Sequence, residues 1–145
     1  MNVEGILAGK RPGAVRTIEP EATIQAAIDQ LVEHNIGSLV VVTPQGQPVG
    51  IITERDILRV CAGGSGGLDA ARVGEAMTAD LIVGEPGDAV DYVMGIMTKN
   101  RIRHLPIVGA QGLLGMVSIG DVVEVQLQET SYENRHLKSY ITGSY

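Results

Sequence analysis

Two places in the sequence carry a hydroxyl side chain followed three residues later by an aspartate: Thr53 with Asp56, and Ser118 with Asp121. In both, a glycine and two apolar residues precede the hydroxyl, and an apolar-periodic segment follows the aspartate. This order predicts a strand that ends and a helix that begins, with the hydroxyl at the N-cap and the aspartate in the first turn. Free N–H groups at a helix start favour a phosphate, and a carboxylate can accept hydrogen bonds from two neighbouring sugar hydroxyls. Each pair is therefore a candidate site for a nucleotide held at phosphate and sugar.

The same spacing is also typical of a capping box, in which the hydroxyl and the acid each bond the other residue's backbone N–H. A capping box stabilises the start of a helix and needs no ligand. For either pair taken alone, capping is the more frequent explanation. The occurrence of the pair twice gives weight to a ligand.

The two pairs belong to an internal duplication that fills nearly the whole chain. Residues 20–24 align with residues 86–90, which lie 66 positions later, and residues 35–42 align with 101–108 at the same offset. A deletion of one residue brings the two hydroxyl–aspartate pairs to an offset of 65. An internal repeat of this length indicates two structural units of the same kind.

The duplication sets the expected organisation of the chain. We expect a first unit over residues 1–65, with a lead segment over 1–16, a second unit over 66–128, and a polar tail over 129–145. A Gly-Gly-Ser-Gly-Gly stretch at 63–67 has the composition of a flexible connector between the units.

Hydrophobic patterns predict an α+β fold in which each unit is a strand, a helix, two strands and a second helix. Thr23 is expected to cap the first helix of the first unit, and Asp88 the first helix of the second unit. The expected strands lie at 15–18, 38–43, 49–52, 80–83, 105–108 and 114–117. Buried strands of one unit need a second layer, and the other unit is the obvious partner.

Composition agrees with a single soluble module. The 145 residues are 44% hydrophobic but include no Phe and no Trp, so aliphatic side chains and Met must build the core. The net charge of -6 argues against nucleic acid or an anionic membrane as the main partner. The single cysteine, Cys61, excludes an intrachain disulfide and is expected to pack as a small hydrophobe. Because no apolar run could span a bilayer and the first residues lack a signal-peptide hydrophobic region, we expect a cytoplasmic protein.

Taken as whole units, the two copies resemble the tandem cystathionine-β-synthase (CBS) domain family. The chain is similar to the stand-alone bacterial members, which consist of a CBS pair without an attached enzyme. The resemblance is carried by Thr-Ile-Glu-Pro at 17–20, Gly-Ile-Ile-Thr-Glu-Arg-Asp at 50–56, Val-Gly-Glu-Ala-Met-Thr at 73–78, Ile-Arg-His-Leu-Pro-Ile-Val at 102–108 and Gly-Met-Val-Ser-Ile-Gly-Asp at 115–121. It implies two βαββα repeats packed around a pseudo-twofold axis, with two equivalent clefts.

The resemblance also implies a ligand, because family members bind adenosine derivatives in these clefts: AMP, ADP or ATP, and in some members S-adenosylmethionine or NAD. By this resemblance, Asp56 and Asp121 hold the ribose hydroxyls. Thr53 and Ser118 face the phosphate, and the adenine lies against the backbone of the first short strand of each unit. The resemblance further implies Thr17, Ile18, Leu81, Ile82, Val83, His104, Leu105 and Pro106 at the clefts, and we also expect Ser38, Arg55, Thr78 and Arg103 there.

The second copy carries more positive charge beside its hydroxyl–aspartate pair than the first copy. Arg101, Arg103 and His104 align with three uncharged residues of the first copy, so we expect the second site to bind phosphorylated ligands more tightly. Two plainer explanations stay open: arginines that line a solvated strand edge, and a structural histidine. Pro106 inside an expected strand indicates an edge or a bulge, with backbone free to meet another group.

These residues favour a regulatory module that binds an adenine nucleotide and passes the signal to an effector protein. We expect no catalytic residue and no metal site, since Cys61 has no nearby histidine in the sequence and the three histidines show no metal-ligand spacing. Two alternatives remain: a structural dimerisation module with no ligand, and an enzyme that acts on the bound nucleotide. The short chain and the disc-like dimers common in the family predict a homodimer.

Overall fold

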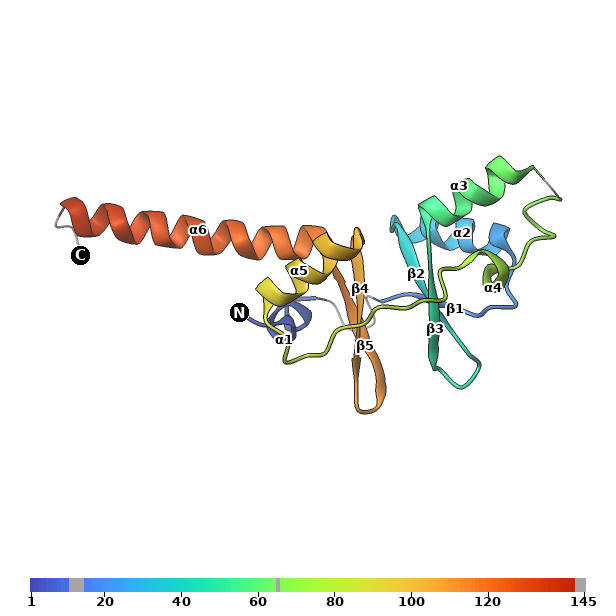
Figure 1. Cartoon of the computed structure of the whole chain (residues 1–145), viewed down its shortest axis with the longest axis horizontal. Helices are drawn as coiled ribbons and strands as arrows, with labels where there is room; N and C mark the ends of the chain where they lie inside the picture. Colours follow the sequence, from blue (N-terminus) through green and yellow to red (C-terminus); the bar gives the residue numbers. More distant parts are fainter. Residues whose placement is uncertain (11–14, 65, 143–145) are drawn as a thin grey trace.

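The computed structural model describes residues 1–10, 15–64 and 66–142 (Figure 1). In chain order its elements are α1 (Val3–Ala8), β1 (Thr17–Ile18), α2 (Ile24–His34), β2 (Ser38–Val42), β3 (Pro48–Thr53), α3 (Glu54–Gly63), α4 (Val73–Ala76), α5 (Val90–Asn100), β4 (His104–Gly109), β5 (Gly112–Ser118) and α6 (Ile119–Thr142). The predicted α+β fold with two repeats is confirmed. The expected connector at 63–67 includes residue 65, which lies outside the described residues.

Each unit has an apolar core of its own. In the first unit β1, β2 and β3 form one sheet, and α2 packs its apolar face against the inward side chains of β2. Thr23 caps α2 as predicted, with its Oγ1 accepting from the Ala26 N–H at 3.1 Å. In the second unit β4 and β5 form a hairpin, and Met97 of α5 and Val122 of α6 are buried with Leu105 in its core.

The two sheets lie next to each other in the middle of the molecule, and the main helices cover their outer sides (Figure 1). Side chains alternate between the faces of a strand, so Leu39 and Val41 of β2 enter the first core while Val40 faces the second unit. Val40 is nevertheless 0% exposed. The second unit therefore provides the other layer that this sheet needs.

The two units exchange short helices. Helix α1 precedes the first repeat in the chain, yet its Val3 and Ile6 are buried in the core of the second unit. The Val3 N–H also donates to the Asp88 carbonyl at 2.9 Å. Conversely, α4 lies at the start of the second half of the chain, before α5, β4 and β5, and its Val73 is buried in the core of the first unit. Each core is thus completed by a short helix from the other half of the chain.

A glycine lies where each exchanged segment crosses the returning strand. A Cβ atom on Gly50 of β3 would lie 2.6 Å from the Met77 Sδ and 2.9 Å from the Thr78 carbonyl oxygen. A Cβ atom on Gly115 of β5 would lie 2.7 Å from a methyl group of Leu7. The two glycines of the repeated motif therefore allow the crossing segments to approach the strand backbone closely.

The strand expected at 80–83 is wrong. The second unit has only a single parallel bridge at this place, between Gly84 and Ile107. In the first unit the Val40 N–H donates to the Arg16 carbonyl at 3.2 Å and extends the pairing of β1. The residue that aligns with Val40 is Pro106, which has no N–H to donate. One ladder hydrogen bond is therefore lost, and residues 81–83 run past β4 without forming a strand.

Three smaller expectations also fail or change. Asp88 does not cap α5, because the N-cap is Ala89, and the Asp88 Oδ2 instead accepts from the Glu85 N–H at 2.9 Å. Cys61 is exposed on α3 rather than packed. The tail that follows residue 128 continues α6 as far as Thr142, beyond the rest of the second unit (Figure 1). No helix of the described residues has the length and apolar character that crossing a membrane requires.

Candidate functional site

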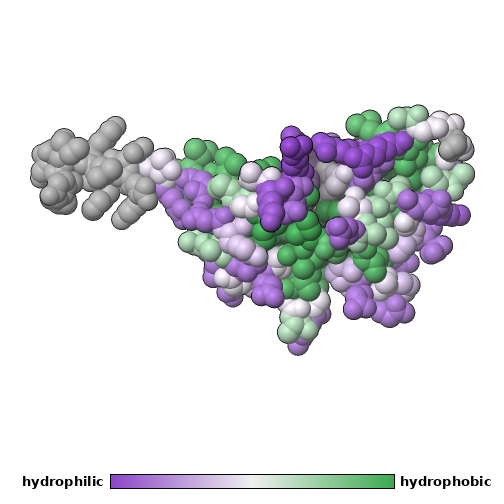
Figure 2. Space-filling view, in the orientation of Figure 1, coloured by the Kyte–Doolittle hydropathy of each residue, from purple (hydrophilic) through white to green (hydrophobic). Residues whose placement is uncertain are grey.

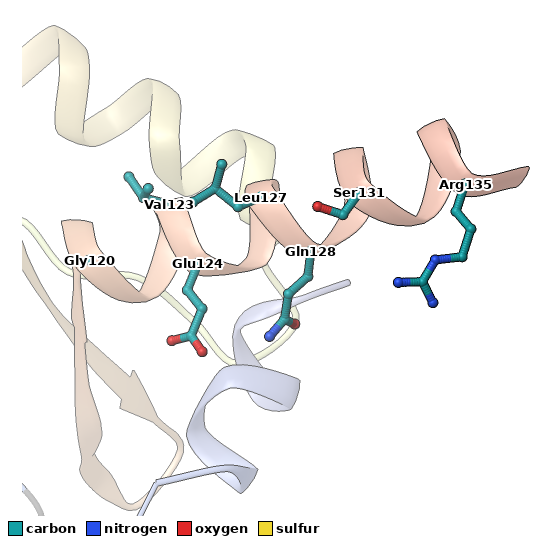
Figure 3. A pocket seen from close by; sticks show the side chains of 7 residues that line it. All are labelled: Gly120, Val123, Glu124, Leu127, Gln128, Ser131 and Arg135. Carbon is teal, nitrogen blue, oxygen red and sulfur yellow. The ribbon is translucent and has the colours of Figure 1, made fainter. Parts of the chain in front are cut away.

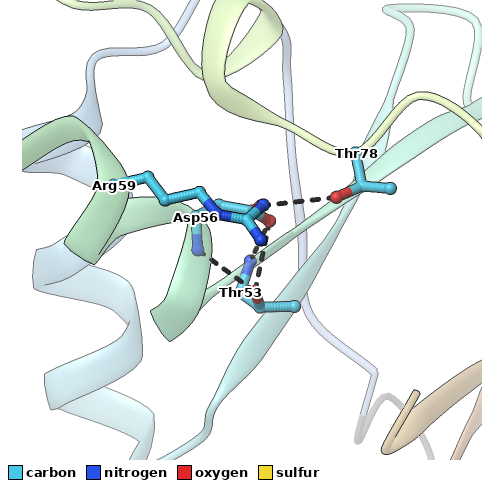
Figure 4. Close-up of polar contacts among 4 residues, drawn as sticks. All are labelled: Thr53, Asp56, Arg59 and Thr78. Atoms are coloured by element: carbon cyan, nitrogen blue, oxygen red, sulfur yellow. Dashed lines mark hydrogen bonds and ion pairs between the residues drawn. The ribbon is translucent and has the colours of Figure 1, made fainter. Parts of the chain in front are cut away.

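Thr53 and Asp56 form a complete capping box at the start of α3 (Figure 4). The Asp56 N–H donates to the Thr53 Oγ1 at 3.4 Å, and the Thr53 N–H donates to the Asp56 Oδ2 at 2.9 Å. The strand β3 ends at Thr53 and the helix begins at the next residue, so the fold itself produces this geometry. The pair therefore stabilises the helix whether or not a ligand is present.

The carboxylate of Asp56 is enclosed by protein donors. The Thr53 hydroxyl donates to its Oδ2 at 3.2 Å, and the Thr78 hydroxyl donates to its Oδ1 at 3.3 Å. Arg59 places a guanidinium nitrogen 3.7 Å from the same Oδ1, a partner that the sequence patterns did not indicate (Figure 4). Asp56 is only 4% exposed. A ribose could reach this carboxylate only by displacing the Thr78 hydroxyl.

Ser118 and Asp121 form the equivalent box at the start of α6. The Ser118 N–H donates to the Asp121 Oδ2 at 2.8 Å, and the Asp121 N–H donates to the Ser118 Oγ at 3.1 Å. The side chain of Asp121 is 24% exposed, in contrast to the buried Asp56. No hydrogen bond or ion pair reaches the Asp121 Oδ1 from the described part of the chain. The second carboxylate is therefore the more open of the two.

Lys10 contacts this second site from the lead segment. Its Nζ lies 2.6 Å from the Asp121 Oδ2 and donates to the Met116 carbonyl at 2.7 Å. Burial acts to raise the pKa of Asp121, but the hydrogen bonds from Lys10 and Ser118 and the charge of Lys10 together outweigh it and lower that pKa. The sequence patterns did not indicate this contact, because Lys10 belongs to the lead segment and lies outside the aligned residues 20–24 and 35–42.

His104 lies directly beside the second pair. It is the partner of Ser118 in the pairing of β4 with β5, as Ser38 is the partner of Thr53 in the first unit. Burial lowers the pKa of His104; the charges of Glu54 and Asp121 oppose this, and those of Lys10 and Arg103 reinforce it. Because Glu54 begins α3, the histidine lies within the field of both helix starts. Its imidazole is held toward the neutral form.

The arginines expected at the clefts have different roles. Arg101 adopts a left-handed conformation, φ 55°, and ends α5, as Asn35 with φ 51° ends α2. Arg103 is exposed, and its carbonyl accepts from the Ile119 N–H at the start of α6 at 2.8 Å. Arg55 is exposed on α3. Of these three arginines, Arg103 is the one whose backbone contacts the start of α6, next to the second pair.

The residues expected near the adenine are only partly available. Ile18 and Leu105 turn their side chains into the two cores, so only their backbone could meet a ligand. Pro106 lies in an edge strand, as expected, and its backbone meets another segment, since its carbonyl accepts from the Gly84 N–H at 2.9 Å. Accessible surface in this region comes from Thr17 on β1 and from Leu81, Ile82 and Val83, of which Thr17 and Val83 are exposed and the other two half-buried.

A separate hollow of about 520 Å³ runs along the outer face of α6 (Figure 3). Gly120 lies at its end nearest the second pair, and the exposed Val123 and Leu127 form its apolar surface. The full lining is Gly120, Val123, Glu124, Leu127, Gln128, Ser131 and Arg135. None of the residues expected to bind a nucleotide belongs to it. Its apolar helix face is suited to another protein surface rather than to a sugar or a phosphate.

The family model described as the CBS domain matches the chain twice, at residues 13–63 and at 73–128. The chain belongs to the CBS domain family. The two matches coincide with the two units, so the protein is a tandem CBS pair.

Relatives and solved structures agree with this assignment. The CBS domain-containing protein CBSX3, mitochondrial, of Arabidopsis thaliana is 42% identical over 127 residues, which are 85% of this chain and 62% of the relative. The CBS-domain containing protein ATU1752 of Agrobacterium tumefaciens superimposes with a TM-score of 0.81 at 35% identity, over 87% of this chain and 99% of that one. The CBS domain pair of protein MJ0100, in complex with 5′-methylthioadenosine and S-adenosyl-L-methionine, gives a TM-score of 0.78 at 28% identity, over 89% and 98%.

Proposed function

We propose that this CBS pair is a regulatory module that binds an adenosine derivative at the start of α6 and passes the signal to an effector protein. The observation that carries the proposal is the partly exposed carboxylate of Asp121, whose Oδ1 has no partner in the described chain, next to Ser118 at a helix N-terminus. A carboxylate oxygen of this kind can accept from a ribose hydroxyl. The catalytic alternative has no comparable support, because no described nucleophile is activated by a neighbouring base at this site.

The charges around the second pair favour a phosphorylated ligand of the AMP, ADP or ATP type. The N-terminus of α6 presents the positive end of its dipole, although the Arg103 carbonyl and the Ser118 hydroxyl already accept from its Ile119 and Asp121 N–H groups. Lys10 and Arg103 add two cations, of which Arg103 is exposed. S-adenosylmethionine and NAD contain the same adenosine unit, and the related MJ0100 pair was solved with two adenosine compounds. The ribose contact is therefore shared by all candidates, and the phosphate would separate them.

The first site is proposed as the weaker of the two. Asp56 has protein donors on both oxygens and is 4% exposed. A ligand there must replace an existing hydrogen bond, whereas a ligand at Asp121 gains a free oxygen. The enclosed geometry of Asp56 also supports the structural alternative, in which both acids act only as helix caps and no ligand binds.

Two measurements separate these functions. Mass spectrometry of small molecules released from the purified, heat-denatured protein identifies any adenosine derivative that copurifies. Thermal unfolding with added AMP, ADP or ATP should then show stabilisation of about 2.7 kcal/mol at a hundredfold excess over Kd. Asp121→Asn should abolish most of this effect, and the exposed Asp69→Asn serves as the matched control. If every nucleotide leaves unfolding unchanged, the capping alternative holds.

We also propose that the protein is a homodimer that pairs through the exposed face of α6. Val123 and Leu127 are 46% and 63% exposed and border the hollow along this helix (Figure 3). Figure 2 shows apolar surface over the described part of α6, beside charged patches. Sedimentation of Leu127→Glu should show monomers at concentrations where the wild type is dimeric. Leu114→Glu, on the exposed β5 hairpin, is the control, and a monomeric wild type would refute the proposal.

A further inference from the structure

Lys10 is held near the second site by its own segment. The α1 helix is anchored by the buried Val3 and Ile6, and the Lys10 N–H donates to the Leu7 carbonyl at 3.1 Å in the turn that ends it. Its ammonium reaches residues 106 and 111 positions later in the chain, Met116 and Asp121. The contact therefore depends on the docking of α1 onto the second unit.

The ammonium takes up hydrogen-bonding capacity that a ligand would use. The Asp121 Oδ2 already accepts from the Ser118 N–H, and Lys10 is its second donor. Two neighbouring ribose hydroxyls bind a carboxylate most simply when each of its two oxygens accepts from one of them. With Lys10 in place, only the Oδ1 is available to a ribose.

In the first unit the neutral donors of Thr78 contact the same two groups, and Arg59 places its charge near the carboxylate. Met116 aligns with Ile51, whose carbonyl accepts from the Thr78 N–H at 2.9 Å, and the Thr78 hydroxyl donates to Asp56. Lys10 therefore supplies from a side chain what Thr78 supplies from its backbone and hydroxyl. A lysine reaches its partners through four flexible methylene groups, so it can leave them without moving the backbone.

We propose that Lys10 is an intramolecular competitor for the second site: its ammonium occupies the Asp121 carboxylate, and a ribose displaces it on binding. The proposal rests on the proposed function. Displacement also makes Lys10 a specificity-determining residue. A released ammonium needs a new partner, which an anionic phosphate provides and a neutral nucleoside does not. Lys10 thus weakens the binding of adenosine more than the binding of AMP.

Calorimetric titration of the full chain with adenosine and with AMP tests this competition. A contact that closes a site nine-tenths of the time lowers the apparent affinity about tenfold. Lys10→Met should therefore bind adenosine about tenfold more tightly than the wild type, and its ratio of AMP affinity to adenosine affinity should fall. Lys10→Arg keeps the charge and should bind like the wild type. Lys99→Met removes an exposed lysine of α5 and should change neither affinity.

The outcomes distinguish the competition from the underlying function. If AMP binds the wild type but Lys10→Met gains nothing for adenosine, the competition is refuted and nucleotide binding stands. If Lys10→Met binds both compounds more weakly, Lys10 contacts the ligand directly and the competition is likewise refuted. If neither compound binds the wild type, Lys10→Met or Lys10→Arg, the proposed function fails and the competition fails with it. A cooperative unfolding transition of Lys10→Met confirms that the variant is folded.

Discussion

The two aspartates of the repeat should differ in what they contribute to stability without ligand. Asp56→Ala removes the acceptor of three hydrogen bonds, from the Thr53 N–H, the Thr53 hydroxyl and the Thr78 hydroxyl. Loss of a helix cap costs about 1 kcal/mol, and a buried donor left without a partner costs about 1–3 kcal/mol. Because Asp56 is 4% exposed, water cannot replace these bonds fully, and we expect a total of about 2–4 kcal/mol. Asp121→Ala should lower the free energy of unfolding by about 1–2 kcal/mol, since its partly exposed site lets water reach the freed groups.

Urea unfolding of both variants measures this difference. For a chain of this size, 1 kcal/mol corresponds to about 3–4 °C in unfolding temperature, so thermal unfolding provides a second readout. Thr78→Val should lower the free energy of unfolding by less than Asp56→Ala does. The double variant should lose less than the sum of the two single losses, because both single changes break the same bond. Equal losses for Asp56→Ala and Asp121→Ala would refute the reasoning that burial distinguishes the two sites.

Three other perturbations follow from particular contacts. Gly50→Ala should destabilise the fold by about 1–3 kcal/mol, because its methyl group would meet the crossing segment, whereas Gly95→Ala, with open space around it inside α5, should stabilise the fold by about 0.5–1 kcal/mol. Because burial lowers the pKa of His104 below its usual 6.5, the neutral form stabilises the fold above that pH, and this contribution is lost as the pH falls through the folded pKa. His104→Gln should therefore flatten the pH dependence of the unfolding free energy below pH 6.5. Replacement of residues 63–67 by an unrelated Ser/Asn sequence should leave nucleotide affinity within about threefold, and a tenfold loss would show that this segment closes over a cleft.

The repeated motif predicted the local structure well because its elements depend on nearby residues. In both units a strand ends at a hydroxyl residue, and an aspartate follows three residues later in the first turn of the helix. These neighbours form both capping boxes. The alternation along β2 and the helical spacing in α2 likewise depend on few positions. The strand expected at 80–83 failed for a nonlocal reason, since the missing donor belongs to Pro106 of another strand.

The long-range arrangement was beyond the reach of these patterns. Nothing in the sequence of α1 or α4 shows that each completes the core of the opposite unit. The contact of Lys10 with Asp121 follows from that exchange, and it distinguishes the two sites more than any residue inside the repeats does. The enclosure of Asp56 by Thr78 is likewise a consequence of the segment that follows α4.

The central claim is that Asp121 holds the ribose of an adenosine ligand, and titration of the wild type with AMP and with 2′-deoxy-AMP tests it most directly. Loss of one sugar hydroxyl leaves a carboxylate oxygen without a donor and costs roughly 1–3 kcal/mol, where each 1.4 kcal/mol is about tenfold in affinity. We predict that 2′-deoxy-AMP binds the wild type at least fivefold more weakly than AMP and that Asp121→Asn removes most of this difference. Equal affinity of the two compounds for the wild type, or an undiminished difference in Asp121→Asn, would contradict the assignment of Asp121 to the ribose.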